Sequence, residues 1–345
     1  MGGGKGTLFI DGWYKQAIFE LTMKNFRLFE TEAEKNEAVI EECSVSYVIE
    51  SDKVYTTPEN GGQGGVDYST MYTTFEALED GTFSFTKKGT GDEIQYSKDN
   101  GVTWMPLASD ETVSVVTGDK VLWKSTITPN FGFGNFSSSN KFNVYGNIMS
   151  LLYGDDFKKQ TSLEGKYQAL HSLFYSNNGL IDASNLILPA TTLSLECYQG
   201  MFNGCTNLTT APELPATTVH QSCYKSMFYG CRSLTTAPEL PATTLAHECY
   251  MYMFKNCTSL TAAPELPATT LANRCYEQMF IDCTSLKHIT MLATDISAYH
   301  CLHYWVENVS STGTFVKHPD MKSLPTGYDG KFGIPNGWTV EDAVL

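Results

Sequence analysis

Cysteine thiols are the side chains of this 345-residue chain whose type and spacing most clearly suggest chemistry. Nine of the ten cysteines fall in two columns of a repeat, and Cys43 lies outside both. The first column is Cys197, Cys223, Cys249, Cys275 and Cys301, and the second is Cys205, Cys231, Cys257 and Cys283. Paired zinc ligands are usually separated by two to four residues, whereas seven residues separate the two cysteines of each repeat, and no histidine column accompanies them. We therefore predict no metal site and no cofactor.

Disulfide formation and thiol catalysis are the other chemistries of such columns. Equivalent residues on neighbouring coils would lie about 5 Å apart, near the spacing of β-strands, so distance alone leaves disulfides open. Five members of one column cannot all pair, however, and parallel Cβ vectors suit a bridge poorly. A catalytic cysteine is singular and has a base in reach. Free, buried thiols that pack an interior are the favoured interpretation.

A second short motif, Ser97–Trp104, fits the pattern S-x-D-x-G-x-T-W. It resembles the Asp box of sialidases and other β-proteins. The resemblance implies a hairpin turn in which Asp99 bonds the local backbone and Trp104 packs into the sheet, both in structural roles. A sialidase needs several boxes and an arginine cluster, whereas this chain has one box and three arginines, Arg27, Arg232 and Arg274. We predict that the chain is not an enzyme, and a glycan-acting enzyme is kept as the weakest hypothesis because no carboxylate pair or activated nucleophile stands out.

Four gapless copies of a 26-residue repeat must position the cysteine columns. They begin at Leu188, Leu214, Leu240 and Leu266, and each opens with Leu-Pro-Ala-Thr-Thr. Degenerate copies of the repeat precede and follow them, as expected where terminal repeats face water. The apolar residues of Cys-Tyr-x-x-Met-Phe have helical spacing, and Leu-Thr before Pro-Glu suits a short strand. We expect one short strand and one helical turn in each coil.

The eight residues Met201–Leu208 and their successors match the core AF-x-x-C-x-x-L of a known repeat family. The repeats resemble the BspA-like leucine-rich repeats of Bacteroidetes, which implies a curved leucine-rich-repeat solenoid. The order of segments along the chain also resembles that of proteins from gut Bacteroides and their tailed phages, including crAss-like phages. A phage virion protein of adhesin or fibre type is the implied identity, with a bacterial cell-surface protein as the alternative.

The predicted fold class is therefore multi-domain α+β. A leader (1–22) precedes a small β-α-β-β module (23–57), whose helix at 31–42 is indicated by the capping box Thr31-Glu32-Ala33-Glu34. A Gly-rich linker (58–70) leads to an antiparallel β-sandwich-like domain (71–155) with short β-rich runs between Gly- and Asn-containing turns. The leucine-rich-repeat solenoid (156–310) and a C-terminal cap (311–345) complete the chain.

Charge and hydropathy restrict the partners. The formal net charge of −15 opposes the phosphate backbone, so nucleic acid is not expected as a partner. No stretch approaches the roughly 20 apolar residues of a membrane span, so no membrane insertion is expected. The beginning of the chain lacks the apolar core of a signal peptide, which favours a virion location over secretion to a bacterial cell surface.

Positions that differ among otherwise identical repeats are the candidates for binding, because packing fixes the invariant positions. The candidates are His220, Gln221, Lys225, Tyr229, His247, Glu248, Tyr252, Lys255, Asn273, Arg274 and Glu277. We predict a non-enzymatic, virion-associated adhesion protein whose repeats bind a host-surface glycan or protein. Other virion or cell-surface proteins are the remaining expected partners, and assembly into a homo-oligomer stays open.

Overall fold

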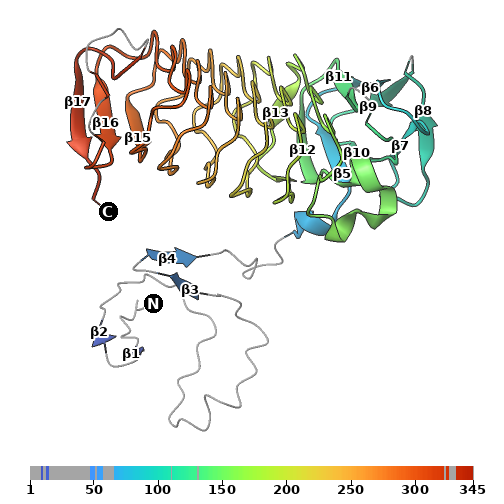
Figure 1. The fold of residues 1–345 in the computed structure, drawn as a ribbon. Helices are drawn as coiled ribbons and strands as arrows, with labels where there is room; N and C mark the ends of the chain where they lie inside the picture. The colour runs from blue at the N-terminus through green and yellow to red at the C-terminus, as the bar shows by residue number, and fades with distance from the viewer. Residues whose placement is uncertain are drawn as a thin grey trace, which may run out of the picture. The chain divides into compact units, whose positions relative to one another are not determined.

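A computed structural model gives the fold (Figure 1). It describes residues 9–10, 13–14, 47–50, 53–56, 66–109, 111–129, 132–321, 324–325 and 332–344. The chain divides into two compact units, Met1–Val66 and Asp67–Leu345. In the first unit β1 (Phe9–Ile10) pairs antiparallel with β2 (Trp13–Tyr14), and β3 (Tyr47–Glu50) with β4 (Lys53–Thr56). The predicted helix at 31–42, and most of the predicted leader, small module and linker, lie outside the described residues.

Two facing β-sheets begin the second unit, after the short 3-10 turn η1 (Tyr68–Thr70). Their strands are β5 (Thr73–Ala77), β6 (Gly81–Lys87), β7 (Ile94–Ser97), β8 (Met105–Leu107), β9 (Thr112–Val115), β10 (Lys120–Lys124), β11 (Gly134–Ser138) and β12 (Phe142–Asn147). One sheet has the order β12-β5-β10-β7-β8 and the other β11-β6-β9, with every one of these pairs antiparallel. The first sheet is extended by β13 (Leu180–Asp182) and β14 (Leu186–Ile187), which pair parallel with β12.

Aromatic side chains fill the space between the two sheets. Phe75 of β5 is fully buried, and its ring centroid lies 5.3 Å from that of Phe83 in β6 and 4.7 Å from that of Phe136 in β11. Phe136 in turn stacks on Phe174, at 5.9 Å, which belongs to the first coil of the repeats. Edge-to-face and offset stacked pairs of this kind add about 0.5–1.5 kcal/mol each beyond the burial of their area. The aromatic core therefore continues without interruption from the sheets into the repeats.

Residues 162–308, which we call the repeat stack, follow α2 (Ser150–Tyr153) and the 3-10 segment η2 (Gly154–Lys159) as successive coils placed side by side (Figure 1). In the coil that contains Tyr198, successive backbone N–H groups donate alternately to a carbonyl of the next coil and to a carbonyl of the same coil. The N–H of Tyr198 donates to the carbonyl of Cys223 on the next coil, at 3.0 Å, whereas that of Met201 donates back to the carbonyl of Tyr198, at 3.2 Å. Half of these groups therefore join neighbouring coils and half close turns within a coil.

Each coil contains three left-handed backbone residues, spaced four positions apart. In the coil that contains Glu196, φ is 55° at that residue, 61° at Gly200 and 78° at Gly204, and the next coils repeat the pattern. Each such residue reverses the local curvature, so the chain advances as consecutive tight turns. Two residues of every four then face the interior, as with Cys197, Tyr198, Met201 and Phe202.

Ladders of identical side chains hold the coils in register. The fully buried rings of Phe174, Phe202, Phe228, Phe254 and Phe280 stack face to face, with centroids 5.4–5.7 Å apart. The rings of Tyr198, Tyr224, Tyr250 and Tyr276 form a second ladder with separations of 5.7–6.0 Å. A shift of one coil by a single residue would break both ladders, so the repeated sequence itself specifies the register.

The predicted fold class, a multi-domain α+β chain with a leucine-rich-repeat solenoid, is wrong. The described residues are mostly strand and turn, their α-helix is the four-residue α2, and residues 188–287 contain no helix and no strand of two or more residues. The expected helical turn and short strand of each coil are replaced by the consecutive turns and isolated bridges such as Thr218–Thr244. The physical reason for the missing helical turn is the set of three left-handed residues in each coil, such as Glu196, Gly200 and Gly204, which an α-helix does not accommodate.

A small parallel sheet closes the far end of the stack. It contains β15 (His288–Met291), β16 (Gly313–Lys317) and β17 (Trp338–Asp342) in that order. Trp305 is fully buried beneath this end, and its indole N–H donates to the carbonyl of Gly333 at 3.0 Å. Among the described residues no helix is long and apolar enough to cross a membrane.

Candidate functional site

The cysteine columns lie inside the repeat stack. All nine cysteines of the described residues are free and buried. In the second column each thiol donates to a phenylalanine carbonyl of the preceding coil, as from Cys205 to Phe174 at 3.0 Å and from Cys231 to Phe202 at 3.1 Å. Burial raises the pKa of Cys197 and of Cys205 to about 12. A thiol with so high a pKa is protonated at neutral pH and is neither a nucleophile nor a metal ligand.

The Ser97–Trp104 segment forms the turn between β7 and β8. The carboxylate of Asp99 accepts hydrogen bonds from the backbone N–H and the hydroxyl of Thr103, at 2.9 and 2.5 Å, and from the Ser97 hydroxyl at 2.7 Å. These bonds lower the pKa of Asp99 to about 2. The half-buried Trp104 packs edge-on against Tyr72, with centroids 4.9 Å apart. Both residues shape the turn and its packing.

Several of the predicted binding residues form one continuous row of charges across the coils. The ammonium of Lys225 lies 2.6 Å from the Glu248 carboxylate, whose other oxygen lies 3.2 Å from the Arg274 guanidinium. Arg274 also donates to Glu277 at 2.6 Å, and the second Glu277 oxygen lies 3.3 Å from Nδ1 of His303. We call these five residues the charged row. They meet because they occupy only two repeat positions, three residues apart, on neighbouring coils.

The two glutamates of the charged row are buried, and the two basic groups are half-buried. Burial raises the pKa of Glu248, but the hydrogen bond and charge of Lys225, together with the charge of Arg274, outweigh it and hold the pKa below its ordinary value. The buried carboxylates therefore orient the more exposed Lys225 and Arg274 side chains from the interior side. The sequence marked Glu248 and Glu277 as surface residues because they vary between copies, but variation here does not mean exposure.

An aromatic group adjoins the charged row. The Lys255 ammonium lies 5.3 Å from the ring centre of Tyr252 and 6.0 Å from that of Tyr229, and it donates to the Gln278 side chain at 2.9 Å. The two tyrosines and the lysine are half-buried. The lysine is thus held between two tyrosines of successive coils, within range of cation–π attraction.

The remaining predicted binding residues are exposed. His220, Gln221, His247 and Asn273 lie on the surface, and the last two directly precede Glu248 and Arg274 in the chain. Nδ1 of His220 accepts a hydrogen bond from the Gln221 N–H at 2.9 Å, and Oδ1 of Asn273 accepts one from the Tyr299 N–H at 2.9 Å. The structure brings His247 to 3.9 Å from Glu248. No interaction joins His220 or Gln221 to the charged row among the contacts of the described residues.

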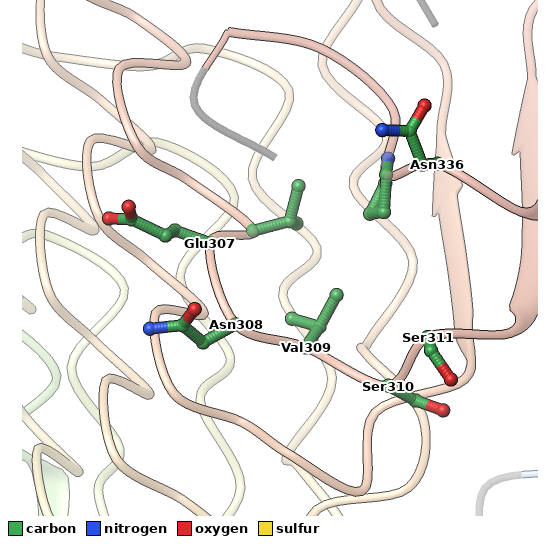
Figure 2. A pocket seen from close by; sticks show the side chains of 8 residues that line it. Glu307, Asn308, Val309, Ser310, Ser311 and Asn336 are labelled. Carbon is green, nitrogen blue, oxygen red and sulfur yellow. The ribbon is translucent and has the colours of Figure 1, made fainter. Parts of the chain in front are cut away.

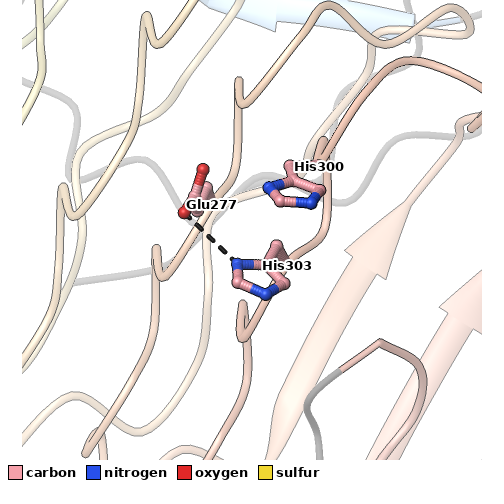
Figure 3. A group of neighbouring side chains, drawn as sticks. All are labelled: Glu277, His300 and His303. Carbon is pink, nitrogen blue, oxygen red and sulfur yellow. Dashed lines mark hydrogen bonds and ion pairs between the residues drawn. The ribbon is translucent and has the colours of Figure 1, made fainter.

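A histidine pair at the end of the row was not predicted from the sequence. Ligand-capable atoms of Glu277, His300 and His303 all lie within 4.8 Å of one another (Figure 3). His300 and His303 occupy the repeat positions of Arg274 and Glu277, one period of 26 residues later. The signal that could have found them is the continuation of these two columns into the degenerate final copy, which lies outside the four gapless repeats.

Two shallow hollows lie at this end of the second unit. One, of about 190 Å³, is lined by Ile296, Ala298, His300, Cys301, Leu302, His303, Leu324 and Phe332. The other, of about 360 Å³, lies between residues 306–311 and residues 335–336, with Glu307, Asn308 and Asn336 among its polar side chains (Figure 2). The first hollow adjoins the histidine pair, and the second is more polar and holds no clustered titratable groups among its lining residues.

No protein-family model matches the chain, and the comparisons with curated proteins and with solved structures find no match either.

Proposed function

We propose that the chain is a non-catalytic, virion-associated adhesion protein whose repeat stack binds a ligand on the host surface. The observation that carries this proposal is the sorting of residues in the stack. Invariant repeat positions form the buried cysteine, tyrosine and phenylalanine ladders, whereas the variable positions collect into the charged row and the adjoining tyrosines. One scaffold can thus carry different surface chemistry on each coil without disturbing its interior.

The chemistry of this surface suits a glycan or a polar protein segment. Tyr229 and Tyr252 offer ring faces, while Lys225, Arg274 and Lys255 offer hydrogen-bond donors for carboxylates, hydroxyls and carbonyls. Buried partners fix the two basic groups of the charged row, which limits the side-chain entropy lost on binding. The raised pKa values of the cysteines agree with a non-catalytic role. The virion location rests on the resemblance to phage proteins.

Binding of the fluorescently labelled full chain to bacteria of the source community, and to the surface polysaccharide extracted from them, tests the proposal. We expect saturable binding that the double variant Tyr229→Ala/Tyr252→Ala weakens about five- to 150-fold, since two aromatic contacts contribute about 0.5–1.5 kcal/mol each. The matched control, Thr217→Ala/Thr243→Ala, changes two exposed threonines of the same repeats and should bind as the wild type. Equal binding by both double variants would exclude the tyrosines as the binding surface.

The virion location needs its own measurement. Mass spectrometry of purified phage particles from the same community should detect peptides of this chain, in an amount comparable to other minor virion proteins. Detection in bacterial surface fractions and in no particle fraction would support a bacterial adhesin instead and would refute the virion assignment. The cell-binding result stands independently of this outcome.

A further inference from the structure

We propose that Glu277, His300 and His303 form a binding site for a divalent transition-metal ion, with zinc as the ion that suits them best. Imidazole nitrogens and a carboxylate oxygen are ordinary zinc ligands. Oε1 of Glu277 and Nδ1 of His303 lie 3.3 Å apart, and one possible ligand atom from each of the three residues, His300 included, lies within 4.8 Å of those of the other two. Two ligands of a tetrahedral zinc with bonds of about 2.0–2.1 Å lie about 3.3 Å apart, so one edge of the site is already formed.

The coils hold the backbone of all three residues. The N–H of Arg274 donates to Tyr299, that of Tyr276 to Cys301 and that of Gln278 to His303, at 2.9–3.0 Å. The backbones that carry Glu277 and the two histidines are thereby fixed to each other on both sides of the site. His300 and His303 are joined by a turn in which the His303 N–H donates to the His300 carbonyl at 3.2 Å. Only side-chain rotation is needed to bring the third ligand closer.

The carboxylate is oriented as a ligand rather than left free. The Glu277 side chain is 5 % exposed, and its Oε2 accepts a hydrogen bond from the Arg274 guanidinium at 2.6 Å. The other oxygen, Oε1, is directed at His303 (Figure 3). A hydrogen bond to the second oxygen of a ligating carboxylate is a common feature of metal sites and fixes its orientation. The charge of Arg274 is in turn balanced by Glu248, at 3.2 Å.

The donor set selects among ions. Cys301 stands between the two histidines in the sequence, but its thiol is engaged elsewhere, because it donates to the Ile296 carbonyl at 3.2 Å. The available set is therefore two nitrogens and one oxygen, which suits zinc, cobalt, nickel and copper, and not magnesium or calcium, which prefer oxygen ligands. His300 and His303 line the hollow of about 190 Å³, so a fourth position is open to water or to a carboxylate of a bound molecule.

Such an ion would join the last two coils of the repeat stack, since Glu277 belongs to the copy that begins at Leu266 and both histidines belong to the degenerate copy that follows. It would close the end of the stack where the ladder of identical residues runs out. This role does not depend on the proposed adhesion function, because the bound ion stabilises the fold whether or not a host ligand is recognised.

Titration of the tag-free full chain with Co²⁺ tests the site, because cobalt in a four- or five-coordinate nitrogen–oxygen site absorbs visible light far more strongly than the hydrated ion. We expect one equivalent to bind, displacement of cobalt by Zn²⁺, and a rise in Tm of about 5 °C at a hundredfold excess of zinc over its Kd. Failure to bind one equivalent with a Kd below about a millimolar would overturn the proposal.

Variants identify the ligands. His300→Ala and His303→Ala should each weaken cobalt binding at least tenfold and abolish most of the zinc-dependent rise in Tm. Glu277 is buried and paired, so the cobalt affinity of Glu277→Gln is interpreted only if this variant keeps the wild-type Tm without metal. The exposed His300 therefore provides the decisive variant. The control His220→Ala/His247→Ala removes two exposed histidines outside the site and should bind as the wild type. Loss of binding in that control, or its persistence in both single variants, would refute the assignment.

Discussion

Replacement of Gly230 by alanine isolates the free-energy cost of the left-handed backbone on which the repeat stack depends. Gly230 has a φ of 72° and belongs to a column of left-handed residues. The column consists of Ser176, Gly204, Gly230, Asn256, Asp282 and Asn308. A Cβ added at Gly230 would meet its nearest neighbour, the Cα of Gly204, at 3.8 Å, which is ordinary contact. The expected cost is therefore purely conformational, about 1–2 kcal/mol of unfolding free energy.

A second glycine of the column separates conformational from steric cost. A Cβ at Gly204 would lie 2.9 Å from the Ser176 hydroxyl oxygen and 3.3 Å from the Ser176 Cα. The hydroxyl can rotate away, but the Cα is part of the neighbouring coil. We therefore expect Gly204→Ala to cost about 1 kcal/mol more than Gly230→Ala, at the lower end of what overpacking costs. Gly230→Asn is the control, because asparagine adds the same Cβ but tolerates the left-handed region, as Asn256 does in the next coil.

Equilibrium unfolding in urea measures all three variants. With a slope of about 3 kcal/mol/M, a loss of 1–2 kcal/mol lowers the midpoint by about 0.3–0.7 M. The expected order of stability is wild type, Gly230→Asn, Gly230→Ala, Gly204→Ala. If Gly230→Ala is as stable as the wild type, or if alanine and asparagine cost the same, the consecutive left-handed turns are not what constrains this column.

Three further perturbations test the interior, the Ser97–Trp104 turn and the charged row. Phe228→Ala removes a fully buried ring stacked between two others and should cost about 3–5 kcal/mol, measured by calorimetry, and a cost under about 1 kcal/mol would contradict the ladder. Hydrogen bonds from Thr103 lower the pKa of Asp99 to about 2. The stabilisation that they give is therefore complete above the unfolded pKa near 4 and is lost as the pH falls through 2. An NMR titration of the Asp99 carboxyl with a midpoint near 3.8 in the folded chain would count against these bonds. Lys225→Met removes the cation that most lowers the pKa of Glu248 and should raise the titration midpoint of that carboxyl, and an unchanged midpoint would show that the ion pair is absent.

The repeat period and the interior of the stack were accessible from the sequence. Identical residues one period apart must occupy equivalent places if the coils stack, and the fully buried Cys197, Tyr198 and Phe202 recur in this way. What spacing could not provide was the path of the backbone within one coil. Pairs of apolar residues separated by two others satisfy a helix of period 3.6 and a chain of tight turns of period four almost equally over nine residues. The choice between them depends on φ at the intervening positions.

Residue types at those positions carried a weak signal of the turns. In the Gly204 column, glycine, asparagine and aspartate tolerate a positive φ. In the column of Glu196, however, the left-handed residues include Glu248 and Arg274, which have no such preference. There the hydrogen bonds between neighbouring coils, such as that from the Glu248 N–H to the Asn273 carbonyl at 3.1 Å, enforce a conformation that the residue type does not favour. Tertiary contacts thus override local propensity, and a single sequence does not display them.

The ion pairs between neighbouring coils change what variation between repeats means. Glu248 and Arg274 occupy one column and Lys225, Glu277 and His303 another, so Glu248 lies beside basic groups of both adjacent coils and Glu277 lies beside His303 of the next coil. Residues that differ between copies are here complementary in charge to their neighbours one coil away. Selection for packing between coils can produce this pattern without any ligand. Binding should therefore be sought first at the exposed His220, Gln221 and His247, outside these ion pairs between coils, and then at the ring faces of Tyr229 and Tyr252 beside Lys255.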